Sequence, residues 1–423
     1  MKTLKVARIA AAGAVAALTA CAAPAPVLLK ADGVERVSVD STAYAAELRA
    51  FRGSALELGA ALLSDGGDGT NGNVVSSPGS LLIALSMLRA GASGDTAVEM
   101  DQVLGLPDGN RDEAMNALLE SLAAYDGDPG SVDEKDPPRK PVMHAANGLF
   151  VDKDVSTGKN YLETLARHYG TGVYPVAFRD EAATKPALDA WVDRNTGGRI
   201  KKSPAEYDPD NTFSLLNGLY FAAAWQSAFD PNDTSDSPFT KSGGEEISVP
   251  TMHQELELAY AEGAGWRAVE LPYAEGFVMR LVLPGPGVGP ETLTAAKLAE
   301  IAEALDMAPG VSVLISLPTW NHKTSFDLRK VFESLGLART LATTEDFDSI
   351  QSRLTLTQAA QAANITVAEK GTVAAAVTQV NGEVTSVQPV PDQTNDFDRP
   401  FHYQIVHSET GLPLFMGKVE DPR

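Results

Sequence analysis

The segment from Glu369 to Thr378 constrains the fold of this chain more than any other stretch. Its sequence, EKGTVAAAVT, joins a glycine to a run of very small side chains with Thr and Val on both sides. Small side chains suit a segment that must enter between existing neighbours, and β-branched residues suit a pleated strand. The alanines are equally compatible with a helix. The residues alone therefore leave two possibilities open: a segment that inserts into a sheet, and an ordinary helix or surface strand.

Composition limits the function classes. The 423 residues, 44% of them hydrophobic, can bury one large core or two smaller ones. The formal net charge of -22 argues against nucleic acid as a partner, because phosphates would be repelled. The one short basic cluster, Arg199 with Lys201 and Lys202, is interpreted as a solvated turn rather than a polyanion site.

The N-terminus has the features of an export signal over residues 1–20. Three basic residues precede Ile9–Ala20, which is apolar but too short to span a bilayer. The stretch ends in Leu18-Thr19-Ala20-Cys21, which resembles the lipobox of bacterial lipoproteins. That resemblance implies removal of the signal before Cys21 and attachment of lipid to its thiol.

Cys21 is the only cysteine, so no disulfide can form within the chain. Residues 21–42 are predicted to be a lipidated polar tether, which places the protein at a bacterial cell surface or envelope, held to the membrane by its lipid. The alternative is an ordinary secretory signal, cut near Ala20 or Ala23, and a secreted protein.

Hydrophobic periodicity predicts an α+β fold, with helices dominant in the first half and strands in the second. Residues 66–73 and 126–139 are interpreted as surface insertions. Helices are predicted to begin near Tyr44 and at Ser77, and to cover about 95–105, 111–124, 158–170, 184–196, 291–306 and 325–336. Strands are predicted at 142–151, 173–178, 212–222, 246–272, 277–284, 310–319, 354–368 and 401–419.

Motifs of enzymes give little support for catalysis. Ser156–Lys159 fits S-x-x-K and Lys241–Gly243 imitates the lysine triplet of penicillin-recognising enzymes, but no S-D-N lies between them and both sit in Gly-rich turns. The six histidines show no pair at metal-ligand spacing. We therefore expect no metal, no cofactor and no enzymatic activity, and a serine hydrolase is the least favoured hypothesis.

An ordered set of short motifs from about residue 44 to the C-terminus resembles the serpin family of protease inhibitors. Each motif is weak alone, but together they cover nearly all of the exported chain. The motifs are NVVSSPGS (73–80), GASGDT (91–96) with LGL (104–106), NGLYF (217–221), VPTM (249–252), ELPY (270–273), PF (400–401) and FMGKV (415–419).

This resemblance implies one serpin domain over residues 43–423, with a reactive loop at about 369–398. The implied fold has a large central, mostly antiparallel sheet that can accept the reactive loop as an extra strand, together with smaller β-sheets and eight to nine helices. A monomer is expected.

The resemblance also assigns roles to particular residues. The hinge of the loop comprises Glu369, Gly371, Thr372, Ala374, Ala375 and Ala376. A latch that keeps the sheet closed but separable comprises Ser77, Ser80, Asn217 and Gln361, with Trp225 where opening starts. Gln361 stands where the family often has a histidine, and glutamine can both donate and accept hydrogen bonds.

Counting from Glu369 as in other serpins places the reactive bond at Thr385-Ser386, with Val384 as the alternative because the loop is slightly long. No Lys or Arg occurs between Lys370 and Arg399, which excludes the usual bait of trypsin-like enzymes. The bait predicts an elastase-like or subtilisin-like target with a small apolar pocket.

The implied function is suicide inhibition of serine proteases, with cysteine proteases as a further class, through insertion of the cleaved loop into the main sheet. The alternative is a non-inhibitory serpin that acts as a surface binding or structural protein. Such members tend to carry bulky, charged or proline residues in the hinge, and residues 371–380 contain none.

Overall fold

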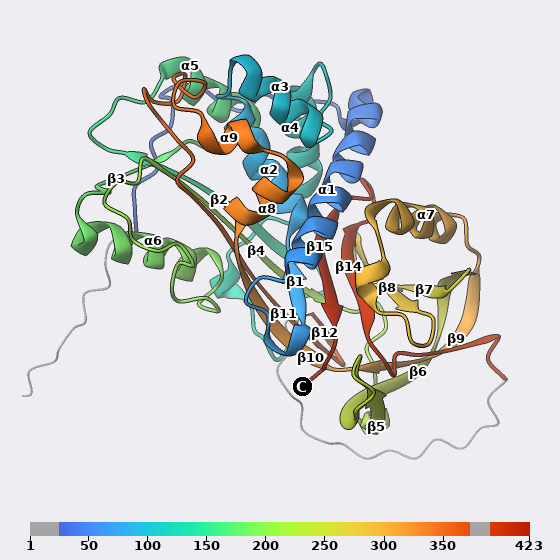
Figure 1. Ribbon diagram of the computed structural model, residues 1–423. Helices are drawn as coiled ribbons and strands as arrows, with labels where there is room; N and C mark the ends of the chain where they lie inside the picture. The colour runs from blue at the N-terminus through green and yellow to red at the C-terminus, as the bar shows by residue number, and fades with distance from the viewer. Residues whose placement is uncertain (1–24, 373–389) are drawn as a thin grey trace, which may run out of the picture.

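The computed structural model describes residues 25–372 and 390–423. Within these residues the chain forms nine α-helices, and all eight predicted helices are among them, some with shifted bounds (Figure 1). They are α1 (Ala45–Asp65), α2 (Pro78–Arg89), α3 (Gly94–Val103), α4 (Arg111–Ala123), α5 (Lys159–Thr164), α6 (Glu181–Asn195), α7 (Ala295–Asp306), α8 (Leu328–Leu335) and α9 (Ala338–Ala342).

The strands form two sheets, and the predicted α+β class is confirmed. The six-stranded sheet has the order β10 (Trp320–Asp327), β11 (Gln358–Ala368), β12 (Gly371–Thr372), β4 (Phe213–Ala224), β2 (Val142–Asp152) and β3 (Tyr174–Val176). The nine-stranded sheet has the order β1 (Val74–Ser76), β15 (Pro413–Val419), β14 (Phe401–His407), β8 (Phe277–Pro284), β7 (Trp266–Pro272), β6 (Glu246–Gly263), β9 (Gly310–Pro318) and β13 (Gln393–Asp396), with β5 (Ser235–Thr240) on β6.

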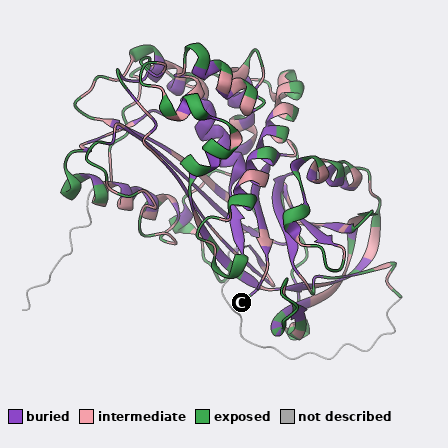
Figure 2. Ribbon diagram, in the orientation of Figure 1, coloured by how far each residue is buried: buried purple, intermediate pink, exposed green. Residues whose placement is uncertain are grey.

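Helices cover both faces of the six-stranded sheet. Helix α2 packs against β2 and β4 on one face, and its residues Pro78 to Leu88 are all buried (Figure 2). Helix α6 packs on the other face, where Leu188, Trp191 and Val192 meet Leu216 of β4 and Ala360 of β11 in one apolar cluster. A sheet covered on both faces needs apolar side chains on both, which explains the unbroken burial of β4 from Phe213 to Ala223.

Two parts of the chain differ from the prediction. Residues 325–327, assigned to a helix, end strand β10, and Asp327 caps the helix α8 that follows. Strand β10 alternates buried and less buried residues from Trp320 onward, which is the period-two pattern of a strand and not that of a helix. The short strands β1, β5 and β13 also escaped prediction, because three to six residues carry little periodicity.

The described part of the N-terminal segment lies against the body. Leu29 forms a β-bridge with Val173, and the Arg36 guanidinium donates to the Asn116 side chain at 2.6 Å. Asn116 in turn donates to the Val37 carbonyl. Residues 25–40, expected to be a tether, thus contact α4 and the loop before β3. No helix in the described ranges combines the length and the apolar character that crossing a membrane requires.

Candidate functional site

The candidate site is the boundary between β4 and β11, which we call the seam. In its closed half, residues 358–362 pair in parallel with residues 214–218. In its open half, β12 lies between the two strands: Gly371 and Thr372 pair with β11 on one side and with β4 on the other. Among the described residues, 363–366 and 219–222 form no ladder with each other. The seam is therefore shut at one end and already parted at the other.

Gln361 latches the closed half to helix α2. Its Oε1 accepts from the Ser77 backbone N–H at 2.9 Å, and its Nε2 donates to the Ser77 carbonyl at 2.9 Å. The same Nε2 donates to Asn217 Oδ1 at 2.6 Å. Ser77, just before α2, also donates its hydroxyl to the Leu414 carbonyl of β15. Gln361 is fully buried, and a buried amide needs partners for both its oxygen and its nitrogen. These three bonds supply them.

Asn217 extends this network across β4. Its Nδ2 donates to Ser80 Oγ at 2.8 Å and to Asn147 Oδ1 at 2.6 Å. The predicted residues Ser77, Ser80, Asn217 and Gln361 are thus brought together. Asn147 of β2, which stands opposite Asn217 in the ladder, was missed. Its only signal was an asparagine in the middle of a mostly apolar strand.

The hinge enters the open half through Gly371 and Thr372. Gly371 has φ +154°, and a Cβ there would collide with the Ala223 carbonyl oxygen, so only glycine fits. Thr372 is 1% exposed, and its hydroxyl shares a short hydrogen bond with the Tyr273 hydroxyl. Burial raises the pKa of Tyr273 well above its ordinary value, so this hydroxyl stays neutral and available for hydrogen bonding.

Trp225 closes the open half from the end of β4. Its indole N–H donates to the Ala368 carbonyl at 2.9 Å, and its ring stacks on Tyr273 with centroids 4.4 Å apart. The Trp225 backbone N–H donates to the Lys370 carbonyl, and the Glu369 carboxylate accepts from Thr234. Trp225 lies at the hinge rather than beside the Gln361 latch. Tyr273, which the sequence placed only in a motif, connects Trp225 to Thr372.

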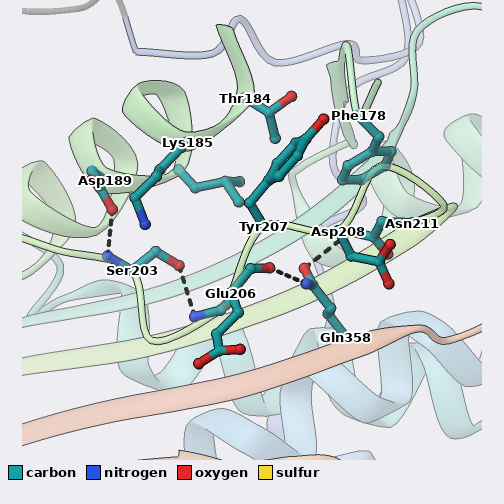
Figure 3. A pocket seen from close by; sticks show the side chains of 12 residues that line it. Phe178, Thr184, Lys185, Asp189, Ser203, Glu206, Tyr207, Asp208, Asn211 and Gln358 are labelled. Carbon is teal, nitrogen blue, oxygen red and sulfur yellow. Dashed lines mark hydrogen bonds between the residues drawn. The ribbon is translucent and has the colours of Figure 1, made fainter. Parts of the chain in front are cut away.

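A second polar group ends the closed half beneath α6. Gln358 Oε1 accepts from Asn211 Nδ2 and from Ser214 Oγ, so β11, β4 and the preceding loop are joined there. Figure 3 shows Gln358 and Asn211 at one side of a small pocket, with Tyr207 and the α6 side chain Lys185 across it. Sequence reasoning missed this group, since polar residues at a strand start give no distinctive pattern.

Several predicted residues lie outside the described ranges. They are the hinge residues Ala374, Ala375 and Ala376, the reactive bond Thr385-Ser386 with its alternative Val384, and the lipidation residue Cys21. In the part of the chain that is described, no group of His, Cys, Asp or Glu could hold a metal ion. Of the discounted enzyme motifs, Ser156 lies in the loop before α5, and Lys241 opens a turn after β5.

Comparison with known proteins identifies the class. The sequence matches the family described as serpin (serine protease inhibitor) over residues 54–422. The chain therefore belongs to the serpin family, whose members are typically protease inhibitors. An uncharacterized serpin-like protein of Thermococcus kodakarensis is 32% identical over 364 residues, which are 84% of this chain and 82% of that protein.

Two further matches support this assignment. Alpha-1-antiproteinase of Rattus norvegicus is 27% identical over 359 residues, 83% of this chain and 84% of that protein. The crystal structure of the thermophilic serpin tengpin in the native state superposes with a TM-score of 0.77 at 24% identity, covering 94% of this chain and all of that one. The structural match shows the shared fold, and the resemblance stated from the motifs is confirmed.

Proposed function

We propose that this serpin is a suicide inhibitor of serine proteases that traps its target by inserting the cleaved reactive loop along the seam. The observation that carries the proposal is the position of Gly371 and Thr372, already paired between β4 and β11 at the parted end. A strand that extends from Thr372 between these two neighbours would bond on both sides. The closed half ahead of it is held by neutral amides, which can separate without exposing charge.

The reaction follows from this geometry. A protease attacks the bait bond, proposed at Thr385-Ser386, and forms an acyl-enzyme with the loop. Inserting about fourteen residues at about 3.4 Å each carries the attached protease roughly 45–50 Å along the sheet. Pressing the protease against the far end distorts its active site, and loss of one oxyanion-hole donor alone slows deacylation by about 10²–10³.

Side-chain alternation supports insertion. Thr372 faces the buried Tyr273 side, so residues 374, 376 and 378, which are Ala, Ala and Thr, would follow on the same face. On the order of ten new hydrogen bonds, each worth about 0.5–1.5 kcal/mol, roughly offset the ordering of the strand at about 1–2 kcal/mol per residue. Burial of these small side chains then makes insertion of the strand favourable overall.

The target and the location are part of the proposal. Thr385 or Val384 fits the small apolar pocket of elastase-like or subtilisin-like proteases, and the stretch between Lys370 and Arg399 offers no cation to trypsin-like ones. Lipid on Cys21 would hold the inhibitor at a bacterial surface, and the segment from residue 25, which lies against the body, would keep the body close to that lipid.

The test is incubation of residues 22–423 with pancreatic elastase, subtilisin and trypsin. We expect an SDS-resistant complex with elastase or subtilisin and none with trypsin, and sequencing of the released C-terminal peptide then locates the bond. Cleavage of the loop should also raise the melting temperature sharply. Digestion as a plain substrate by all three proteases would instead identify a non-inhibitory member of the family.

A further inference from the structure

The segment between α4 and β2, residues 126–139, is more than a surface insertion. It lies over the six-stranded sheet beside the open half of the seam, and we call it the strap. The Pro138 carbonyl accepts from the Ala224 N–H at the end of β4, and the Lys135 carbonyl accepts from the hinge residue Lys370. Val132 packs on Tyr220 and Ala222 of β4. The strap therefore contacts the hinge and the strand that borders it.

Arg199 joins the strap to both edges of the seam. Its guanidinium donates to Asn364 Oδ1 of β11 at 2.8 Å, and it pairs with Glu134 of the strap at 2.8 Å. The same guanidinium lies 5.9 Å from the ring centroid of Tyr220 on β4. The Arg199 side chain is only 15% exposed, which corrects the interpretation of the basic cluster at this residue as a solvated turn.

These contacts lie where the two strands no longer pair with each other. Tyr220 belongs to residues 219–222 of β4, and Asn364 to residues 363–366 of β11. Asn364 is held in orientation because its Nδ2 donates to the His322 carbonyl of β10 at 3.0 Å. Its neighbours Ala363 and Ile365 face the main core, so Asn364 faces the opposite side, as Tyr220 does. Arg199 thus spans the open half on the face that the strap covers.

We propose that Arg199, held by Glu134, is a clasp across the open half that must release before the loop inserts, and that it sets the rate of insertion. This inference rests on the proposed function. A strand placed between β4 and β11 leaves them two strand spacings apart, or about 9.6 Å. One guanidinium cannot then stay bonded to Asn364 and remain over Tyr220. The clasp is a restraint specific to insertion, separate from the Gln361 latch in the closed half.

The test measures insertion without a protease. A labelled synthetic peptide with the sequence of residues 371–385 is added to the intact protein, and its uptake into the sheet is followed by native gel shift over time. We expect Arg199→Met, which keeps an apolar stem over Tyr220, to take up the peptide about tenfold faster, since it loses hydrogen bonds from a charged donor. Glu134→Gln should speed peptide uptake about threefold, because Glu134 is half-exposed and its ion pair with Arg199 contributes less.

Two controls make the result specific. Asp133→Asn changes the strap charge by the same amount as Glu134→Gln, forms no ion pair among the described residues, and should leave the rate unchanged. The double variant should match Arg199→Met alone if both residues act through one clasp, whereas general destabilisation would make the effects add. Unchanged or additive rates overturn the clasp. If the parent takes up no peptide at all, the proposed function itself fails and the clasp fails with it.

Discussion

The closed and open halves of the seam join the same two strands by different means. In the closed half, β4 and β11 pair directly, and the buried amides of Gln361 and Asn217 join them to α2. In the open half, the strands are joined indirectly, through Thr372 between them and Trp225 at the end. The closed half is therefore held by direct contacts between β4 and β11. The open half is held by residues outside the β4–β11 ladder, namely Thr372 and Trp225.

This contrast between the two halves shows how a sheet can be both stable and separable. Hydrogen bonds between neutral groups contribute about 0.5–1.5 kcal/mol each, since they replace bonds to water or to other partners. The closed half can exchange such bonds one by one for bonds to an entering strand. A seam held by large interdigitated apolar side chains would lose its packing in one step and would resist entry. The polar character of Gln361 and Asn217 is thus suited to a strand exchange.

The largest expected effect is at Thr372, the innermost described residue of the hinge. Thr372→Arg places a long cation where the native side chain is buried against Tyr273, so β12 should no longer hold its place between β4 and β11 and the rest of the loop should not follow. We expect complex formation with the target protease to fall by about two orders of magnitude or more, with cleavage as a substrate in its place, because burial of an unpaired charge costs several kcal/mol. Thr372→Ser keeps the hydroxyl and should trap normally. If the Thr372→Arg protein traps its target as well as the parent does, the open half is not where the loop enters the sheet.

Acid should act away from the seam. Burial lowers the pKa of His322 and of His407 to about 4, and burial with the nearby Arg280 lowers that of His402 to about 3. These groups stay neutral in the folded state while the unfolded state binds protons below about pH 6.5, so stability is lost as pH falls from about 6.5 towards 4. At pH 5.5 each should cost about 1.4 kcal/mol relative to pH 7.5.

The measurement is urea unfolding at the two pH values. His407→Gln should remove about one third of the pH-dependent loss, while the same change at the half-buried His253 serves as the matched control. The hydrogen bonds of Gln361 and Thr372 involve uncharged side chains. Neither half of the seam should therefore contribute to the change in unfolding free energy between pH 7.5 and pH 5.5. If the parent and the His407→Gln protein lose the same unfolding free energy between pH 7.5 and pH 5.5, this account is wrong.

A smaller effect is expected in the closed half. Gln361→Ala leaves the Ser77 backbone groups and Asn217 without their buried partner, which should cost about 2–3 kcal/mol of native stability. The cleaved form, in which the seam is already filled, should lose less. Exposed Gln226→Ala is the control. A native form that unfolds at the parent's urea concentration would show that the closed half does not depend on Gln361.

Local patterns in the sequence determined much of this protein. Helical spacing placed α1 and α2, strand alternation placed β9, and the ordered motifs identified the family and the latch residues Ser77, Ser80, Asn217 and Gln361. These features depend on periodicity and on residue types that a single chain displays directly. The polar contacts of the latch follow from the family fold once the motifs are aligned with it.

Which distant residues lie together at the seam became visible only in the folded chain. The local sequence around Asn147, Tyr273 and Arg199 does not show their roles, because these come from partners 70, 99 and 165 positions away in the chain. The sequence predicted that the loop can enter the sheet, but not that Gly371 and Thr372 already pair between β4 and β11 before any cleavage. Hydrogen bonds and ion pairs act over about 3 Å in space regardless of separation in sequence, and that is why folding had to bring these groups together before their functions could be inferred.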